Sequence, residues 1–289
     1  MARVHSALMN TPTPILCELA DPHLAGFETY SPFCMKVHRA LRVLGVAYER
    51  RHGAHPGVFR AHNPTGQVPV LLVGDETLAD STAILRYLEA KHGGLVPSDP
   101  REAAEAWLWE EHGDTSLNGF FVAARWADPQ SWPLVRAAYF RDMPAPVRWI
   151  LPGRLRAGVL ASLKARDVLR RSFDDTLARH EAALDALDRR APRSGYWLGD
   201  ALTVADLSLF AQLHGLRAPL TPRQAKLIAE RPQLTAWLDR VDAATAETRP
   251  RGASAQSPQA RAMASAMPPP VVPSAASRSV ARSFTSSGA

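Results

Sequence analysis

The sequence has few of the features that mark secreted, membrane-spanning or metal-binding proteins. It contains only two cysteines, Cys17 and Cys34, in 289 residues. A secreted domain held by disulfides would have more, so we expect a reducing compartment and a cytoplasmic protein. No apolar run approaches the ~20 residues that cross a bilayer. Residues 1–13 lack the apolar core of a secretory signal and are expected to be a disordered lead. The ten histidines are scattered, so we expect no metal site.

Excess positive charge is also missing from most of the chain, although the net charge is +6. Residues 248–289 contain five arginines and no acidic residue, which leaves 29 basic and 28 acidic residues before them. A nearly neutral body does not present the basic surface of a nucleic-acid-binding domain, so we expect no nucleic-acid partner. Residues 248–289 are rich in Ala, Ser, Pro and Arg and poor in large apolar residues, which predicts a disordered tail.

Strand and helix patterns alternate over residues 14–95, which predicts a small α/β domain. Short apolar runs indicate strands, and Gly74-Asp75 indicates a hairpin turn. Apolar residues at helical spacing indicate two helices. The predicted elements are strands at 14–20, 46–51, 68–73 and 76–79 and helices beginning at Pro32 and at Asp80 or Ser81.

After a linker at 93–99, strand patterns nearly vanish, so residues 100–247 are predicted to form an all-helical domain. Thr203-Val-Ala-Asp206 is a capping box at the start of one helix. The segment 128–171 is atypical because it is rich in Pro, Trp and Arg, and we expect it to be partly helical. The other helices are predicted at 101–124, 172–190, 203–216 and 232–247.

Three segments of the chain occur in a specific order: Ser31-Pro-Phe-Cys34-Met-Lys-Val37, Asn63-Pro-Thr-Gly-Gln67-Val68-Pro69-Val70-Leu71, and Leu78-Ala-Asp80-Ser81-Thr-Ala-Ile84-Leu. Together they resemble the glutathione S-transferase family, closely over residues 14–95 and loosely over 172–245. The resemblance implies a thioredoxin-like α/β N-terminal domain followed by an all-α helical-bundle domain. It also implies glutathione as co-substrate, a role in detoxification and a homodimer.

Ser31 lies at the start of the helix that begins near Pro32. Such a helix end offers unpaired N–H groups and partial positive charge, which stabilise a nearby thiolate. The resemblance implies that the Ser31 hydroxyl donates a hydrogen bond to the sulfur of glutathione. Ser31 also fits the simpler role of a helix cap. Tyr30 is a second candidate hydroxyl donor, because several classes of the family use tyrosine.

Cys34 occupies the second cysteine position of the Cys-x-x-Cys pattern of thioredoxins, and Ser31 occupies the first. A dithiol cycle therefore lacks its usual nucleophile. We expect a helix residue rather than a redox centre, with a glutathione-dependent thiol-transferase activity of Cys34 as a third functional alternative.

The remaining glutathione contacts follow from the resemblance. Val68-Pro69 resembles the cis-proline of the family, which leaves the backbone of Val68 free to pair with the cysteinyl part of glutathione. Ser81 and helix N–H groups would bind the γ-glutamyl carboxylate, and Asp80 its ammonium. Gln67 is a further contact. The cation for the glycyl carboxylate stays open among Arg51, His52, His55 and Arg60.

The segment 128–171 supports two interpretations. Its aromatic residues could roof an apolar pocket for the second substrate. Its last part, 148–171, has seven basic residues and one acidic residue, with apolar residues between them, so it could also contact a membrane surface or an acidic partner. We favour a solvated helix over the membrane contact. The aromatic residues are Trp126, Trp132, Tyr139, Phe140 and Trp149.

These observations lead to one primary function and one alternative from another class. The primary hypothesis is a glutathione transferase that joins the glutathione thiolate to a small hydrophobic electrophile. The alternative is a scaffold without catalytic activity that binds a protein partner or a membrane. It takes support from the loop at 21–30, which is longer than in most members and resembles that of metaxin-like branches.

Overall fold

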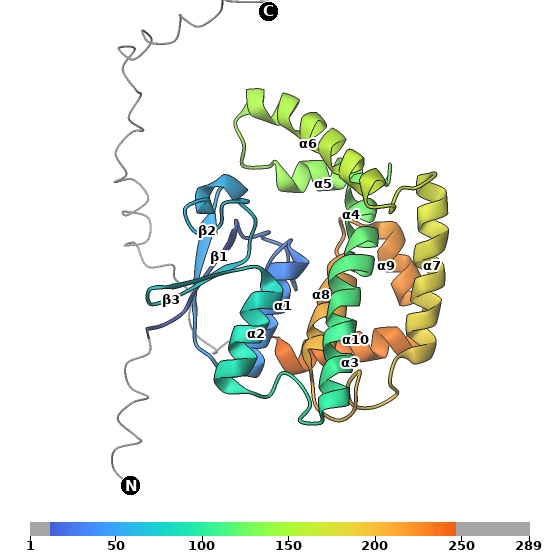
Figure 1. Ribbon diagram of the computed structural model, residues 1–289. Helices are drawn as coiled ribbons and strands as arrows, with labels where there is room; N and C mark the ends of the chain where they lie inside the picture. Colours follow the sequence, from blue (N-terminus) through green and yellow to red (C-terminus); the bar gives the residue numbers. More distant parts are fainter. Residues whose placement is uncertain (1–11, 247–289) are drawn as a thin grey trace, which may run out of the picture. The chain divides into compact units, whose positions relative to one another are not determined.

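The N-terminal part of the chain contains four short strands: β1 (Ile15–Leu19), β2 (Glu49–Gly53), β3 (Val70–Val73) and β4 (Glu76–Ala79). They form one mixed sheet in the order β2-β1-β3-β4 (Figure 1). β1 is parallel to β2 and antiparallel to β3, and β3 forms the predicted hairpin with β4. The structure is a computed structural model that describes residues 12–246. The predicted tail and nearly all of the predicted lead therefore lie outside the described residues.

Helices α1 (Pro32–Val43) and α2 (Ser81–His92) pack on one face of this sheet (Figure 1). Their apolar residues form one buried cluster with the inward side chains of β1 and β3. On the opposite face, Cys17 and Val70 pack against Phe59 of a short 3₁₀ helix, η1 (Pro56–Phe59). The sheet is thus covered on both faces, as a thioredoxin-like arrangement requires.

Two predicted strand starts were wrong. Gly45 has a φ of +64°, and the Val46 N–H donates to the carbonyl oxygen of Leu41 at 2.9 Å. The residues after α1 therefore complete a glycine-based helix end, and β2 begins only at Glu49. β3 begins at Val70 rather than Val68, because Val68 and Pro69 lie in the loop before it and are joined by a cis peptide bond.

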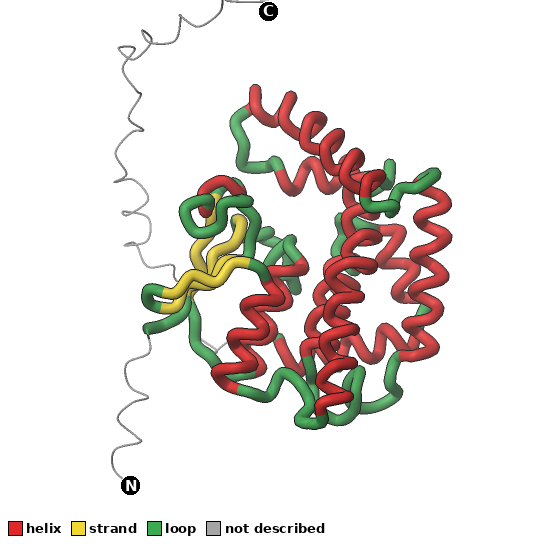
Figure 2. The backbone as a smooth tube through the Cα atoms, viewed as in Figure 1, coloured by secondary structure: helices red, strands yellow, loops and turns green. Residues whose placement is uncertain are grey.

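The rest of the described chain is helical, and Figure 2 shows strands only in the N-terminal part. The predicted fold is confirmed: a thioredoxin-like sheet domain followed by a helical domain. Helix α8 lies at the centre of the helical domain, with every one of its residues buried. The helices are α3 (Pro100–His112), a π-helical segment η2 (Gly113–Leu117), α4 (Asn118–Trp126), α5 (Trp132–Tyr139), α6 (Ala145–Ala165), α7 (Phe173–Arg190), α8 (Val204–Leu216), α9 (Pro222–Ala229) and α10 (Pro232–Thr245).

Three features of the helical part differ from expectation or refine it. The helix predicted at 101–124 is divided by η2, whose wider turns shift the phase of the helix. The atypical segment 128–171 contains two helices, α5 and α6. Helix α9 was missed because it has eight residues, too few for a clear periodic pattern.

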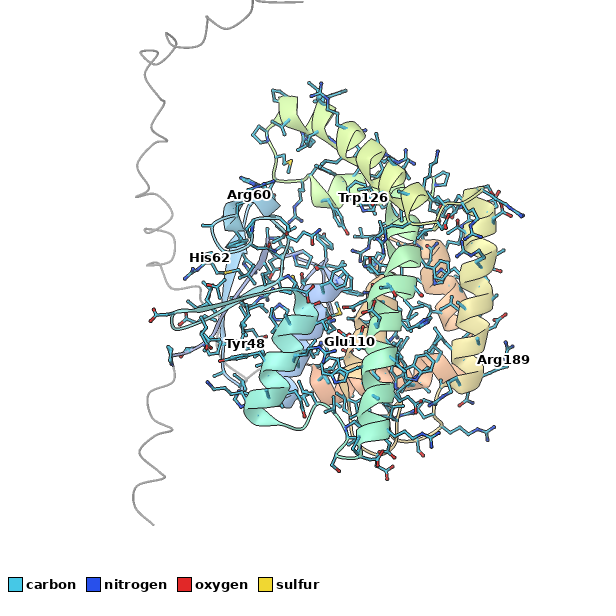
Figure 3. The ribbon with its side chains drawn as sticks, in the orientation of Figure 1. Tyr48, Arg60, His62, Glu110, Trp126 and Arg189 are labelled. Atoms are coloured by element: carbon cyan, nitrogen blue, oxygen red, sulfur yellow. The ribbon has the colours of Figure 1, made fainter. Side chains whose placement is uncertain are left out.

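Buried ion pairs join helix α1 of the α/β part to the helical part of the chain. The Nζ of Lys36 on α1 lies 2.5 Å from Glu110 on α3 and 2.5 Å from Asp114 in η2. Glu110, labelled in Figure 3, lies where α3 faces the α/β part. Residues 12–246 all belong to one compact unit, so the domain boundary between residues 95 and 100 stays a prediction.

Candidate functional site

The first part of the site is the N-terminus of α1. Ser31 is the N-cap residue, and its Oγ accepts a hydrogen bond from the Cys34 N–H at 3.3 Å. Its own N–H donates to Oγ1 of Thr29 at 3.2 Å. Pro32 follows at the first helical position, where its missing N–H costs nothing. A hydroxyl can accept and donate at the same time, so capping leaves the Ser31 proton available to an incoming sulfur.

The hydroxyl of Tyr30 has a partner within its own loop. It donates to the carbonyl oxygen of Pro22 at 3.2 Å, and its ring lies 4.9 Å from that of Tyr139. Burial raises the pKa of the Tyr30 phenol, so it stays protonated near neutral pH. Of the two candidate hydroxyls, Ser31 is the one at the helix end.

The long loop at 21–30 is tied to α1 and to the helical domain. Its Glu28 accepts hydrogen bonds from Arg39 at 2.6 Å and from Arg42 at 3.1 Å, and Arg39 also pairs with Asp242 of α10 at 2.8 Å. The Phe27 ring lies 4.7 Å from that of His214 on α8. These contacts hold the residues that lead into Ser31, although the loop is longer than usual.

Cys34 lies inside the protein. Its side chain has no solvent exposure, and burial, reinforced by the negative charge of Glu18, raises the pKa of its thiol far above the ordinary value. The protonated thiol is a poor nucleophile. Cys17 on β1 is equally buried, and its thiol pKa is also raised by burial.

A cavity of about 330 Å³ opens between the residues before β3 and the start of α2. It brings together the five residues that the resemblance assigned to glutathione: Gln67, Val68, Pro69, Asp80 and Ser81. Phe33 on α1 lines the same cavity and connects it to the Ser31 helix end. The cavity therefore lies beside the first turn of α1, and the predicted catalytic residues Tyr30, Ser31 and Cys34 are not among the residues that line it.

Asp80 and Ser81 form the polar end of this cavity. Asp80 caps α2 through a hydrogen bond of 3.0 Å from the Ala83 N–H to its Oδ1, and it has a φ of +85°. A positive φ is rare for a residue other than glycine and is found most often at functional sites. Ser81 is the first residue of α2 and is almost completely buried. The helix N–H groups beside it can bind an anion.

Sequence reasoning missed the residue that shapes the loop before Val68. The Asn63 side chain donates to the carbonyl oxygen of Gln67 at 3.0 Å and accepts from the N–H and hydroxyl of Thr65 at 3.2 and 2.9 Å. Asn63 and Thr65 also line the cavity. Asn63 is the first residue of the matching segment, which was the available signal for its role.

The cation for a glycyl carboxylate stays unassigned. Within the described chain, Arg51, His52, His55 and Arg60 are all outside the lining of this cavity. His52 lies 3.3 Å from the buried carboxylate of Glu18. Arg60 follows η1 and is exposed (Figure 3).

The predicted aromatic roof is only partly assembled. Trp126 lies 5.4 Å from Trp132 and 6.0 Å from Tyr139 between ring centroids, and Tyr139 contacts Tyr30. Figure 3 labels Trp126 at the end of α4 below α5 and α6. Trp149 does not join this group, because it is 77% exposed on α6.

Residues 12–246 contain neither a metal-binding cluster nor a membrane-spanning helix. No group of three or more His, Cys, Asp or Glu side chains is arranged to hold a metal ion. No helix combines the length and apolar character needed to cross a membrane.

Comparison with known proteins identifies the relatives of this chain. Models of the N-terminal and C-terminal domains of glutathione S-transferase match residues 26–96 and 166–240. Glutathione S-transferase 3 of Zea mays is 30% identical over 223 residues, which cover 74% of this chain and 86% of that protein. Protein LigF of a Sphingobium strain is 25% identical over 201 residues, covering 65% and 75%.

Solved structures share the fold. The crystal structure of the beta-etherase LigF matches with a TM-score of 0.56 at 22% identity, covering 82% of this chain and 96% of that chain. A glutathione S-transferase of Methylobacterium radiotolerans, solved in complex with glutathione sulfonate, matches with a TM-score of 0.54 at 21% identity, covering 84% and 98%.

Proposed function

Because the chain belongs to the glutathione S-transferase family, we propose that it binds reduced glutathione and transfers its sulfur to a small apolar electrophile. The observation that carries this proposal is the cavity beside the start of α1, lined by Gln67, Val68, Pro69, Asp80 and Ser81. Its polar residues suit the γ-glutamyl group, and Phe33, which also lines it, is two residues after Ser31 in the chain.

The γ-glutamyl group is held at the start of α2. Its carboxylate accepts hydrogen bonds from Ser81 and from the N–H groups of the first helical turn. Its ammonium is bound by Asp80, whose carboxylate uses one lone pair for the Ala83 N–H and has others available. The cysteinyl backbone pairs with that of Val68, which lies outside the strand ladders.

The sulfur then lies beside Ser31. The thiol gives its proton to solvent, and the thiolate is stabilised by the Ser31 hydroxyl and by the partial positive charge of the helix end. The thiolate attacks an electrophilic carbon, a C–S bond forms, and the leaving group departs with the electron pair of the bond that breaks. One relative is named a beta-etherase, so an ether, in which the broken bond is C–O, belongs among the electrophiles to test.

Kinetics with glutathione and chlorodinitrobenzene test this function. We expect Ser31→Ala to lower kcat/KM by about 100-fold through loss of thiolate, and Ser31→Thr, which keeps the hydroxyl, to retain most activity. Tyr30→Phe should change little, because that hydroxyl already donates to Pro22. Full activity in both Ser31→Ala and Tyr30→Phe would show that the assigned chemistry is wrong.

A second candidate function is a scaffold that contacts a partner through α6. Four of the seven large apolar side chains that are exposed in the described chain lie on this helix: Val147, Trp149, Ile150 and Leu155. Their presence favours contact with another surface. Retention on immobilised glutathione separates the two functions. A protein that fails to bind it, and that loses a partner or vesicle contact in Trp149→Ser, acts as the scaffold.

Assembly and location complete the proposal. Members of the family usually form homodimers, so the active form is proposed to be a homodimer, which size-exclusion chromatography with light scattering would test. Both cysteines are free thiols in the folded chain, which fits a reducing cytoplasm. A role in detoxification is proposed from the family alone.

A further inference from the structure

One buried cation among residues 12–246 has no carboxylate partner within that range. The described residues include four buried lysine or arginine side chains: Lys36, Arg39, Arg125 and Arg231. Three of them pair with carboxylates, at 2.5 Å for Lys36 and 2.6 Å for Arg39 and Arg231. Between residues 12 and 246, Arg125 has no such pair. A buried charge without a counter-ion costs free energy, so its presence indicates a function.

Arg125 is held by neutral oxygen atoms from three parts of the chain. One guanidinium nitrogen donates to the carbonyl oxygen of Tyr30 at 2.6 Å and to the hydroxyl of Tyr139 at 2.5 Å. The other donates to the carbonyl oxygen of Gly215 on α8 at 3.0 Å. Its Nε is buried without a partner in the described chain. The ring of Phe121 lies 3.9 Å away and covers one face.

The surroundings do not cancel this charge. The ionisable groups that act on Arg125 electrostatically are the phenols of Tyr139 and Tyr30. Burial raises the pKa of both phenols, so they are neutral near pH 7. Arg141 and Asp142 also influence Tyr30, and they pair with each other at 3.4 Å. The guanidinium stays protonated, because burial lowers the pKa of an arginine from a very high ordinary value.

The charge lies close in the chain to the residue that is proposed to bind the sulfur. Tyr30, whose carbonyl oxygen Arg125 binds, immediately precedes Ser31. Covalent geometry limits the distance from the guanidinium to the Ser31 hydroxyl to about 8 Å. A sulfur that accepts a hydrogen bond from that hydroxyl lies within about 11 Å of the guanidinium. At that distance, in a partly buried site, a unit charge can change the pKa of an acid by about one unit.

We propose that the buried charge of Arg125 stabilises the glutathione thiolate beside Ser31, acting together with the N-terminus of α1. This inference rests on the proposed function. Arg125 is a positioning residue in this scheme, because it touches Tyr30 rather than the sulfur. Its guanidinium supplies the positive charge for an anion that arrives only with the substrate, which explains why no carboxylate among the described residues neutralises it.

The pKa of enzyme-bound glutathione, read from the ultraviolet absorbance of its thiolate, tests this role. Arg125→Gln keeps N–H donors and removes the charge, and we expect it to raise this pKa by about one unit and to lower kcat/KM at pH 6.5 about 10-fold. Arg125→Lys keeps the charge and should leave the pKa near that of the wild type. Within residues 12–246, Arg240 likewise donates only to neutral oxygen atoms, the carbonyls of Gly195 and Pro192, so Arg240→Gln is the matched control and should not shift the pKa.

Binding of S-methylglutathione, which has no thiol proton, separates charge from general disruption. Its affinity should stay within about 2-fold of the wild type in Arg125→Gln. If thermal unfolding shows that Arg125→Gln does not fold, Arg125→Met takes its place. An unchanged thiol pKa in the neutral variant, or equal shifts in the neutral and lysine variants, would overturn the role of Arg125. Failure of the wild type to bind glutathione would overturn the proposed function itself.

Discussion

The indole Nε1 of Trp237 on α10 donates a hydrogen bond of 3.0 Å to Oδ1 of Asp206 on α8. The same carboxylate closes the predicted capping box, because its other oxygen accepts from the N–H and hydroxyl of Thr203 at 3.0 and 3.1 Å. It also accepts from the N–H of Trp197 at 2.7 Å. The buried side chain of Asp206 therefore connects the start of α8 to α10 and to the loop between α7 and α8.

Replacing Asp206 by alanine should destabilise the fold strongly. The change leaves four buried donors without an acceptor, and we expect the free energy of unfolding to fall by roughly 3 kcal/mol. Urea unfolding followed by circular dichroism measures it. Asp200→Ala, at an exposed position, is the control and should stay within about 0.5 kcal/mol. Equal stability of the two variants would contradict this account.

Stability should fall in acid because of Glu18. Burial alone would raise the pKa of this carboxyl, but hydrogen bonds from His38, His52 and Arg50 hold it far below its ordinary value. A carboxyl with a lower pKa in the folded state stabilises the fold above its unfolded pKa of about 4.3, and the contribution is lost as pH falls below that value. Glu18→Gln should cost roughly 3 kcal/mol at pH 7 and flatten the pH dependence below about pH 4.3. Urea unfolding from pH 3 to 7 tests this, with exposed Glu76→Gln as control.

Ser81 should contribute to glutathione affinity more than to turnover. Its hydroxyl lines the polar end of the cavity and is proposed to bind the γ-glutamyl carboxylate. A hydrogen bond to a charged group is worth about 1.5–3 kcal/mol, so Ser81→Ala should raise the Kd for glutathione at least about 10-fold. Isothermal titration calorimetry measures this, with Thr77→Ala on exposed β4 as control. An unchanged Kd would place the γ-glutamyl group elsewhere.

Sequence reasoning succeeded where short-range chemistry decides the structure. The N-cap roles of Ser31 and Asp80 and the capping box at Thr203 depend on residues three positions apart, so local patterns predict them. Cis Pro69 was also found, because it lies in a segment with a specific family pattern. The grouping of Pro69 and Asp80 around one cavity followed from the fold, which the sequence predicted correctly.

Prediction from the sequence failed where residues far apart in the chain contact one another. Arg125 and Tyr30 are 95 positions apart, and nothing in the local sequence of α4 distinguishes this arginine from a surface residue. The start of β2 was wrong because the apolar Val46 fits a strand pattern, whereas its N–H completes the end of α1. Trp149 resembled a roof residue by composition alone, but it lies on an exposed helix.

Neither cysteine should react in the folded protein. Both side chains are fully buried, and burial raises the pKa of both thiols. Ellman's reagent at pH 8 should therefore detect almost no thiol in the native protein and both thiols in denaturant. Cys34→Ser should keep glutathione transfer within about 2-fold of the wild type. Rapid labelling of the native protein that disappears in Cys34→Ser, together with a loss of thiol-transferase activity, would instead support the alternative function of a glutathione-dependent thiol-transferase.

Gly113, the first residue of the π-helical segment η2, packs closely against Ser208 of α8, and this contact gives a last test. A Cβ added to Gly113 would lie 2.4 Å from Oγ of Ser208 and 3.2 Å from its Cβ, so η2 can pack against α8 only with glycine at this position. Gly113 has a φ of −60°, so the cost of a side chain comes from crowding rather than from backbone strain. We expect Gly113→Ala to destabilise the fold by about 2 kcal/mol, as overpacking does.

Ser208→Ala removes the closest atom of that contact, but it also removes hydrogen bonds to Asp114 Oδ1 at 2.8 Å and to the Glu110 carbonyl at 3.0 Å. In a double-mutant cycle measured by urea unfolding, the two changes together should cost less than the sum of the single changes, by about 1 kcal/mol. Additive costs would mean that Gly113 is required for a reason other than its contact with Ser208. A matched substitution, Gly158→Ala, adds a Cβ to helix α6 where no atom lies within 4 Å, and it should stabilise the protein slightly because alanine favours a helix.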